Sequence, residues 1–485
     1  MTVKSLASRD HAAPAGPQRR GSVWRDASIQ LRAIDILTVM TAASLPWSTT
    51  APAIFIVLWL IVLVPTVDWE EFGRMLAHPA CALPLAFFAL GLVGMLWSDG
   101  GWSDGLRGVK PVAKLLLIPF LFYHFQRSQR VSWVFIAFLV SCTLLMMLSW
   151  IVLFVPAFKI TVTASAGVPV KNYIDQSQEF ALCAFALMLP ASICLRRRQP
   201  VAAVGCVGLL LAFFANMLFV ASARTALIYI PVVLALFAAR HLKRRATLTL
   251  FAAAAVAMTL VWSTSPYLRK RVGNIAVEYQ DFRNNAVSST AQRLDFWGKS
   301  ARFFANAPIV GHGTGSTRQL FERDAVGQTG LSAEVIDNPH NQTLNVAVQW
   351  GLLGVAILYA MWLHHLALFR GAGLEPFPFR WNRNGVLVFC FDAFSSREPV
   401  PHGACHRARI RATRWLENAL ACWIGLVVVV QNVVSSLFNS HLFDFHEGWI
   451  YVLGVGIAGG TSLRAMTRQQ KAGPGEARCG AINAR

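Results

Sequence analysis

One histidine, at a boundary between polar and apolar sequence, has the chemistry of a general base. His340 lies in DNPHNQTLNVAVQWGLLG, at the start of a long apolar run. A neutral imidazole accepts a proton from a hydroxyl at neutral pH, which other unperturbed side chains do less well. There are two alternatives: His340 is a solvated histidine at a helix start, or the segment is polar because Asp337, Asn338 and Asn341 are capping residues. We take His340 as the candidate base, with Asn341 and Gln342 as supporting polar side chains.

Two arginines have the chemistry of phosphate ligands. Arg224 lies in SARTALIY at 222–229, between two apolar runs, and Arg293 lies in STAQRLDFWGKSARFF. A planar guanidinium suits two-point binding of a phosphate group. The alternatives are an interfacial anchor for Arg224 and an exposed arginine on a surface helix for Arg293. Trp297 follows one helical turn after Arg293, and we favour an interfacial anchor over stacking on the arginine.

A glycine-rich segment, PIVGHGTGS at 308–316, lies between these arginines and the apolar run after His340. Its alternating glycines form neither GxGxxG nor a P-loop, because GK[ST] is missing. Glycine permits positive φ and a close backbone approach. The segment therefore predicts a tight turn that presents backbone N–H groups, with Gly313 as a possible supporting residue.

The spacing of potential metal ligands favours no metal site. Histidines and acids near His340 form neither HExxH nor DxD nor a paired-histidine motif. The 9 cysteines include no CxxC pair, so neither a zinc site nor a disulfide framework is supported. Asp444, close to the last apolar run, is kept as a possible supporting residue. We expect neither a metal nor another cofactor.

The composition indicates that these residues are positioned by membrane helices. The 485 residues are 55% hydrophobic and only 14% charged, whereas a soluble domain carries about 25% charged residues. A soluble enzyme and a disordered chain are thereby excluded. The apolar runs are continuous, which argues against a membrane β-barrel. The net charge of +20 is explained by basic cytoplasmic loops, and no nucleic-acid partner is expected. The prediction is an all-α integral membrane protein.

About twelve transmembrane helices are predicted, since a span needs about 20 mostly apolar residues. The fourth and eighth runs are short. The runs are 32–48, 52–67, 80–97, 110–124, 132–156, 179–195, 201–221, 225–240, 247–264, 343–369, 417–437 and 446–464.

Charge predicts the orientation of these spans. Cytoplasmic loops of membrane proteins are rich in Lys and Arg. With twelve spans and a cytoplasmic N-terminus, the arginine-rich connections all lie in the cytoplasm, so both termini are expected there. The predicted divisions are a cytoplasmic arm (1–31), nine spans (32–264), a non-cytoplasmic insertion (265–342), the tenth span (343–369), a cytoplasmic loop (370–416), two spans (417–464) and a cytoplasmic tail (465–485).

Two of the connections are long. The 265–342 insertion contains helix-like sequence at 291–307, with apolar residues at helical spacing, and predicts one or two helices over the mouth of the bundle. The 370–416 segment is rich in Gly, Pro and Arg and predicts a poorly ordered loop.

Together the motifs resemble the O-antigen ligase and polymerase family of bacterial inner membranes. The resemblance rests on twelve spans and on four motifs in order. The motifs are SART at 222–225, RLDFW at 293–297, PIVGHGTG at 308–315 and PHNQTLNVAVQWGLLG at 339–354. They cover residues 222–354, and the remaining spans agree mainly in number and hydropathy.

The resemblance implies a metal-independent, inverting glycosyltransferase of the GT-C type with a helical periplasmic insertion. The donor would be an O-antigen glycan on undecaprenyl diphosphate, and the acceptor a sugar hydroxyl of lipid A-core. The family roles fall on Arg224 and Arg293 as diphosphate ligands and on His340 as the base. Possible support comes from Asn341, Gln342, Trp297, Gly313 and Asp444. The site would face the periplasm, with membrane lipids around the spans.

Three other functions remain open from the sequence. An O-antigen polymerase would use the same donor with a second glycan as acceptor. A protein O-oligosaccharyltransferase would usually carry more periplasmic sequence near the C-terminus. A transporter would place polar residues at mid-membrane, often on broken helices, whereas here most candidates cluster at one face. The spacing of the periplasmic motifs favours the ligase.

Overall fold

A computed structural model describes residues 27–163, 165–221, 223–371 and 404–471, and these residues contain helices and no strand. The α-helices are α1 (Ala27–Ser44), α2 (Thr50–Leu63), α3 (Trp69–Leu76), α4 (Pro79–Val93), α5 (Trp102–Ala113), α6 (Leu117–Arg127), α7 (Val131–Phe154), α8 (Tyr173–Arg196), α9 (Pro200–Phe219), α10 (Arg224–His241), α11 (Arg244–Thr264), α12 (Pro266–Arg283), α13 (Ser289–Asn306), α14 (Thr317–Asp324), α15 (Gln342–Gly371), α16 (Ala404–Ser435) and α17 (Phe445–Lys471). Short 3-10 turns are Val64–Thr66, Gly94–Trp97, Lys114–Leu116, Pro156–Phe158 and Gly330–Ala333.

Eight stretches of the described chain are helical, long and apolar enough to cross a membrane. They are Pro79–Trp97, Val131–Phe154, Tyr173–Arg196, Pro200–Phe219, Arg224–His241, Arg244–Thr264, Gln342–Arg370 and Trp415–Ser435. A ninth is reached if α2 and α3, which are bent by 112°, act as one broken span. The protein is thus a helical, multi-pass membrane protein, while the figure of twelve spans stays a prediction.

The membrane helices differ in what surrounds them. The side chains of α8 are mostly buried among neighbouring helices. In contrast, α11 has no buried residue and exposes Leu248, Val256, Leu260 and Trp262. Exposed apolar side chains of this size would be costly in water, and lipid removes that cost. The outer position of α11 therefore agrees with a membrane protein.

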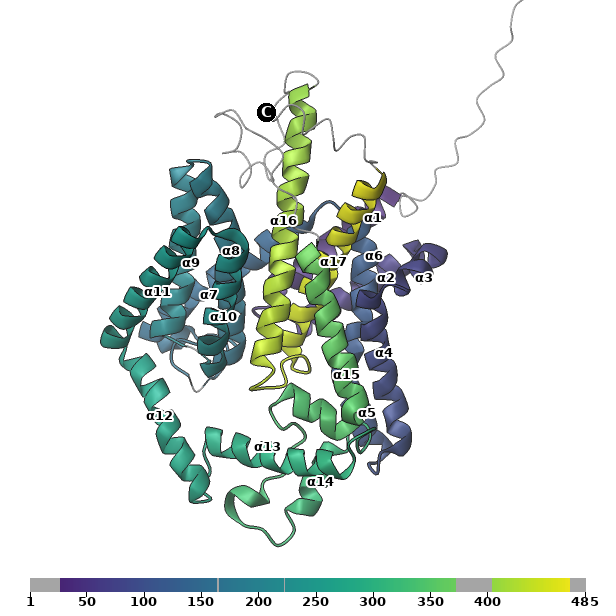
Figure 1. The fold of residues 1–485 in the computed structure, drawn as a ribbon, viewed down its shortest axis with the longest axis vertical. Helices are drawn as coiled ribbons and strands as arrows, with labels where there is room; N and C mark the ends of the chain where they lie inside the picture. The colour runs from purple at the N-terminus through teal and green to yellow at the C-terminus, as the bar shows by residue number, and fades with distance from the viewer. Residues whose placement is uncertain (1–26, 164, 222, 372–403, 472–485) are drawn as a thin grey trace, which may run out of the picture.

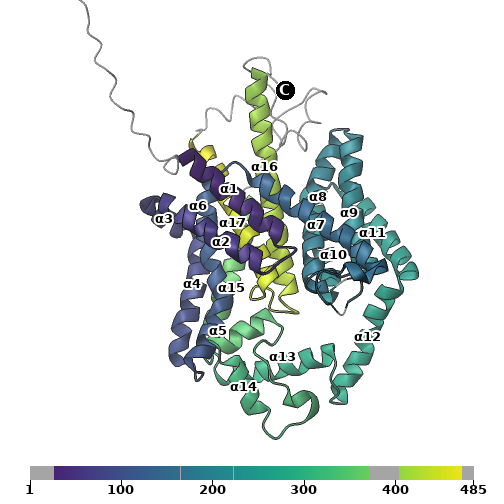
Figure 2. The ribbon, with the colours of Figure 1, turned by 180° about the vertical axis from the view of Figure 1, so that it is seen from behind.

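The helices of the 265–342 segment lie together at one end of the bundle. Figures 1 and 2 show α12, α13 and α14 beyond the ends of the spans, with α12 at the end of α11 and with α13 and α14 close to the start of α15. The helix expected at 291–307 is confirmed by α13, but the segment holds three α-helices instead of one or two. Phe296, Phe303 and Phe321 form its small core with Val348 of α15.

The tenth predicted span is broken. Gly351, inside α15, has φ 60° and ψ −156°, a conformation that other residues rarely adopt. The loop that precedes α14 is paired with this break. Its carbonyl groups at Pro308 and Ile309 accept hydrogen bonds from the N–H groups of Leu352 (2.8 Å) and Leu353 (3.2 Å). The loop thus satisfies backbone groups that would otherwise be unpaired near the membrane.

Several predicted boundaries need correction. The run at 110–124 is not one helix, because a 3-10 turn (Lys114–Leu116) separates α5 from α6. Of the predicted loop at 370–416, residues 404–416 belong to α16, and 372–403 lie outside the described residues. The N-terminal arm is described only from Ala27, where α1 begins, and the tail only to Lys471, where α17 ends.

Candidate functional site

His340 lies in the loop that leads into α15, and its backbone is held in an uncommon conformation. Its φ is 55°, and its N–H donates to Asn338 Oδ1 over 3.0 Å. The same Asn338 oxygen accepts from Ser440 Oγ over 2.6 Å. Asn341 Nδ2 donates to the carbonyl oxygen of Leu437 over 2.9 Å. The loop before α15 is therefore fastened to the loop between α16 and α17, which fixes His340.

A chain of hydrogen bonds orients the imidazole. Asn439 Nδ2 donates to Asp444 Oδ2 over 2.8 Å, so the amide oxygen of Asn439 faces His340. That oxygen lies 2.7 Å from His340 Nδ1. An amide oxygen can only accept, so Nδ1 carries the proton and Nε2 keeps its lone pair. The Asp444–Asn439–His340 arrangement, here called the relay, thus presents Nε2 as the basic nitrogen.

Burial sets the protonation of this region. It is the main cause of the lowered pKa of His340. The hydrogen bond that His340 donates to Asn439 partly opposes this shift, and the Arg293 charge lowers the pKa further. Burial also raises the pKa of Asp444 to about 6 and lowers that of His441 to about 4. At neutral pH the imidazole of His340 is therefore neutral, as a general base must be.

Arg293 and His340 line one cavity. It measures about 320 Å³ and lies between α13 and the segment before α15. Its other lining residues are Ser289, Gln292, Phe296, Glu334, Val335 and Ile336. The size falls within the usual range for ligand sites. The structure therefore brings two of the three principal candidates into one space, called the Arg293 cavity below.

The aromatic and amide candidates support the same loop. Trp297 Nε1 donates to the carbonyl oxygen of Pro339 over 3.1 Å, so this side chain fastens α13 to the residue before His340. The backbone N–H of Gln342 donates to the carbonyl oxygen of Ser436 over 2.9 Å. The side-chain amide of Gln342 is fully buried, and neither of its polar atoms has a hydrogen-bond partner.

Arg224, the third principal candidate, is engaged elsewhere. At the start of α10, its guanidinium forms a two-point ion pair with Glu278 of α12, with Nη1 2.7 Å from Oε2. Nη1 also donates to Thr290 Oγ1 over 3.1 Å. The hydrogen bond from Arg224 is the main cause that lowers the pKa of Glu278 to about 2. Arg224 does not line the Arg293 cavity, but Thr290 is adjacent to Ser289, which does.

The glycine-rich segment has a packing role, which corrects one expectation. Gly313 has φ 90°, and a Cβ there would lie 2.5 Å from Ser98 Cα. The N–H of Gly313 donates to the carbonyl oxygen of Gln349, and that of Gly315 to Gln349 Oε1, both over 2.9 Å. These N–H groups serve the fold and are not presented to a ligand. The glycines instead let the loop approach α4, α5 and α15 closely.

One cluster could hold a cation. Within the described chain, His441, Asp444 and Glu447 bring one potential ligand atom each to within 4.8 Å of one another. His441 is buried, and neither ring nitrogen makes a hydrogen bond. Lys114 Nζ, however, donates to the carbonyl oxygens of Phe443 and Asp444. Its ammonium already supplies positive charge beside the carboxylates, which reduces the need for a metal ion.

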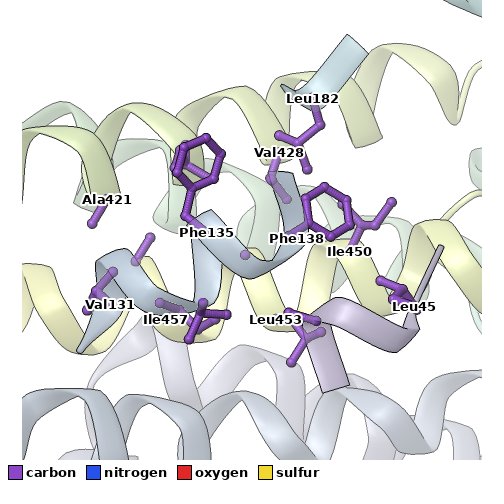
Figure 3. Close-up of a pocket in the computed structure, with 15 residues that line it drawn as sticks. Leu45, Val131, Phe135, Phe138, Leu182, Ala421, Val428, Ile450, Leu453 and Ile457 are labelled. Carbon is purple, nitrogen blue, oxygen red and sulfur yellow. The ribbon is translucent and has the colours of Figure 1, made fainter. Parts of the chain in front are cut away.

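An apolar cavity lies away from these groups. This space measures about 80 Å³. Figure 3 shows side chains of α7, α8, α16 and α17 around it, among them Phe138, Leu182, Val428 and Leu453. All of its lining side chains are hydrocarbon or glycine. The cavity suits apolar contacts and offers no acid, base or nucleophile.

The fold and the site together define a multi-pass helical membrane protein with a histidine and an arginine in one cavity at a single end of its spans. Residues 207–359 match the family model described as O-antigen ligase. The resemblance carried by the motifs at 222–354 is thereby confirmed, and this stretch contains Arg224, Arg293 and His340. No curated protein matches the chain.

Asn439 is the functional candidate that the sequence analysis missed. It lies in the short polar connection SSLFNSHLFDF between the last two apolar runs, outside the matched stretch. Asp444 is the residue of this connection that was predicted from the sequence as a supporting group. The signal that was available is the density of amide, hydroxyl and imidazole groups in so short a connection at the predicted site face.

Proposed function

We propose that the protein is an O-antigen ligase. It transfers a glycan from undecaprenyl diphosphate to a sugar hydroxyl of lipid A-core, at the periplasmic face of the bacterial inner membrane. The observation that carries this proposal is the shared Arg293 cavity, where an oriented base and a guanidinium lie at the end of the spans. Both termini are then cytoplasmic, and the 265–342 segment covers the site.

His340 acts as the general base in this proposal. Nε2 removes the proton from the acceptor hydroxyl as its oxygen forms a bond to the anomeric carbon of the donor. The bond from that carbon to the phosphate oxygen breaks, and the diphosphate leaves with the electron pair. A single displacement inverts the anomeric configuration. The relay stabilises the imidazolium, because the Asn439 oxygen accepts from Nδ1 throughout.

The arginines stabilise the leaving group. A departing diphosphate needs positive charge more than it needs a proton, and a guanidinium supplies charge and two hydrogen bonds. Arg293 lies beside His340, so it is placed to contact the phosphate nearest the reacting carbon. Arg224 joins if diphosphate exchanges with the Glu278 carboxylate. No step of this scheme is routed through a metal ion.

Replacing Asn439 by alanine is expected to lower kcat by about 10–100-fold, because the imidazolium loses a hydrogen bond that it needs in the transition state. The donor KM should change little, since Asn439 touches His340 and not the substrate. The measurement is steady-state transfer at several pH values, where the acidic limb should also move. The Asn439→Asp variant keeps an oxygen toward Nδ1 but loses the N–H that donates to Asp444, so it should retain more activity than Asn439→Ala. Equal loss in both variants would contradict the positioning role.

Transfer in the presence of EDTA tests the function and its metal independence together. Purified full-length protein receives undecaprenyl-diphosphate glycan and lipid A-core, and glycan-bearing lipopolysaccharide is the expected product, with an unchanged rate in chelator. Longer undecaprenyl-linked glycan without a lipid A product would make the protein a polymerase. Loss of activity in EDTA, restored by a divalent cation, would show that transfer needs a metal ion, for which the His441 cluster is the candidate site. If neither product forms, the result favours the hypothesis that the protein is a transporter.

A further inference from the structure

A second polar cavity lies beside the loop that carries His340. It measures about 150 Å³ and is bordered by α5, the start of α14, α15 and the segment before α15. This volume is far above the roughly 10–15 Å³ that a single water molecule requires. We call it the amide cavity, since Asn338, Asn345 and Gln349 line it. Asp104, Arg107, Gly108, Pro111, Gly315, Thr317, Arg318, Asp337 and Phe443 complete the lining.

The amide cavity is lined by oriented polar groups that can hydrogen-bond a hydroxyl-rich ligand. Gln349 Nε2 donates to Asn345 Oδ1 over 2.8 Å, and both side chains are buried and held in one orientation. Thr317 is only 2% exposed, yet its Oγ1 has no hydrogen-bond partner among the residues that the structure describes. An unmet buried hydroxyl is unfavourable unless a ligand or water completes it. The cavity also offers the carboxylate of Asp337 and the aromatic ring of Phe443. Such a small set of polar groups beside an aromatic ring can fix the orientation of a polar ligand.

The two cavities share one short segment of the chain in their linings. Val335, Ile336 and His340 border the Arg293 cavity, whereas Asp337 and Asn338 border the amide cavity. Asn338 is also the residue that holds the backbone of His340. A ligand in the amide cavity would thus lie next to the loop of the proposed base.

We propose that the amide cavity binds a sugar ring of the acceptor glycan. This inference rests on the proposed function and deepens it. In a single displacement the nucleophile approaches the anomeric carbon from the side opposite the leaving group. The leaving diphosphate belongs to the side of Arg293, and of Arg224 beyond it. The reacting acceptor hydroxyl must still reach His340 Nε2 in the Arg293 cavity, so the ring in the amide cavity is a neighbouring sugar of the acceptor, held next to the His340 loop on the segment that lines both cavities.

The glycine-rich segment helps to form the wall of the amide cavity. Gly315 lines the amide cavity, and Gly108 of α5 faces it so closely that a Cβ on Gly108 would lie 2.7 Å from the Gly315 nitrogen. This contact brings α5 and the start of α14 together around the cavity. Arg107 and Arg318 stand at the mouth with their acidic neighbours Asp104 and Glu322, 3.4 and 2.9 Å away.

Binding of the acceptor alone tests the inference without turnover. The probe is deacylated lipid A-core oligosaccharide, titrated into full-length protein in the absence of donor. Thr317→Val keeps the side-chain shape and removes only the unpaired hydroxyl, so the fold is retained or stabilised. We expect the Kd for core oligosaccharide to rise about three- to tenfold in Thr317→Val and in Asp337→Asn. The control is Ser300→Ala, which removes another buried, unpaired hydroxyl from α13, outside this lining.

These outcomes distinguish a failure of the proposed acceptor cavity from a failure of the proposed ligase activity. An unchanged Kd in both variants, or no binding by the unaltered protein, overturns the inference even where the ligase assay succeeds. Weaker binding of the donor glycan, with core binding unchanged, assigns the cavity to the donor and also overturns it. Core binding that depends on Thr317 supports the cavity even if no transfer product forms, and in that case only the proposed ligase activity fails.

Discussion

His340→Ala is expected to lower kcat/KM for glycan transfer by about 10²–10⁴-fold, the usual contribution of a general base. The Nε2 atom is the group that would receive the acceptor proton, and no other imidazole lines the Arg293 cavity. Insertion and helix content should stay unchanged, because the side chain of His340 makes its hydrogen bond to Asn439 and not to a span. The measurement is product formation from radiolabelled donor, with circular dichroism of the same sample.

A matched control is His364→Ala. This second histidine is exposed on α15, and its ring hydrogen-bonds only the Ala360 carbonyl of its own helix. It should transfer glycan at the unaltered rate. Normal transfer by His340→Ala would remove the base from the mechanism, and equal loss in both variants would point to a general effect of histidine removal.

The acidic limb of the pH profile adds a second readout of His340. Burial lowers the pKa of His340 below its ordinary 6.5, and the base works only when neutral. Activity should therefore be full above pH 6.5 and fall as the pH drops through the pKa of His340. Burial raises the pKa of Asp444 to about 6, so protonation of this carboxylate weakens the relay over the same range.

The class of the fold and the three principal candidates followed from local sequence. A low charge fraction and long apolar runs are properties of composition, and they do not depend on which helices touch. That these two residues share one face was also predictable, because Arg293 and His340 both lie within the 265–342 insertion. Their common cavity agrees with that expectation.

The relay was not predictable, because it depends on contacts between distant parts of the chain. Asn439 is 99 residues from His340, and only the packing of α16 and α17 beside α15 brings them together. The break at Gly351 has the same origin. A helical pattern over 343–369 predicts one span, but a loop 44 residues earlier supplies the hydrogen bonds that make the break stable. The sequence next to His340 or Gly351 therefore does not indicate the distant residues that contact them.

Broken spans are common in transporters, so the break at Gly351 could by itself indicate a transporter. Here the interrupted backbone is occupied by the protein's own loop, since the carbonyl oxygens of Val348 and Gln349 accept from the N–H groups of His312 and Gly313, both over 2.9 Å. A transporter would instead turn such groups toward a cavity. The break thus anchors the segment between α13 and α14 and is compatible with the proposed ligase.

Replacing Arg293 or Arg224 by alanine is expected to lower kcat by about 10²–10³-fold, the usual cost of one lost electrostatic donor. Arg293→Ala removes the guanidinium that lies beside His340 in the Arg293 cavity. Arg224→Ala removes the second positive charge along the diphosphate. Single-turnover transfer with saturating donor measures these effects on the chemical step. Activity above one tenth of the unaltered rate in Arg293→Ala would contradict its role as a diphosphate ligand.

Glu278→Gln decides what the ion pair of Arg224 does. If Arg224 is a diphosphate ligand, Glu278 is the group that the diphosphate must displace, and loss of its charge should maintain or raise activity. If the pair only clamps α12 to α10, both Arg224→Ala and Glu278→Gln weaken the same contact and should lower activity and thermal stability together. The ligand role therefore predicts opposite effects of two substitutions in one ion pair, whereas the clamp predicts the same effect for both.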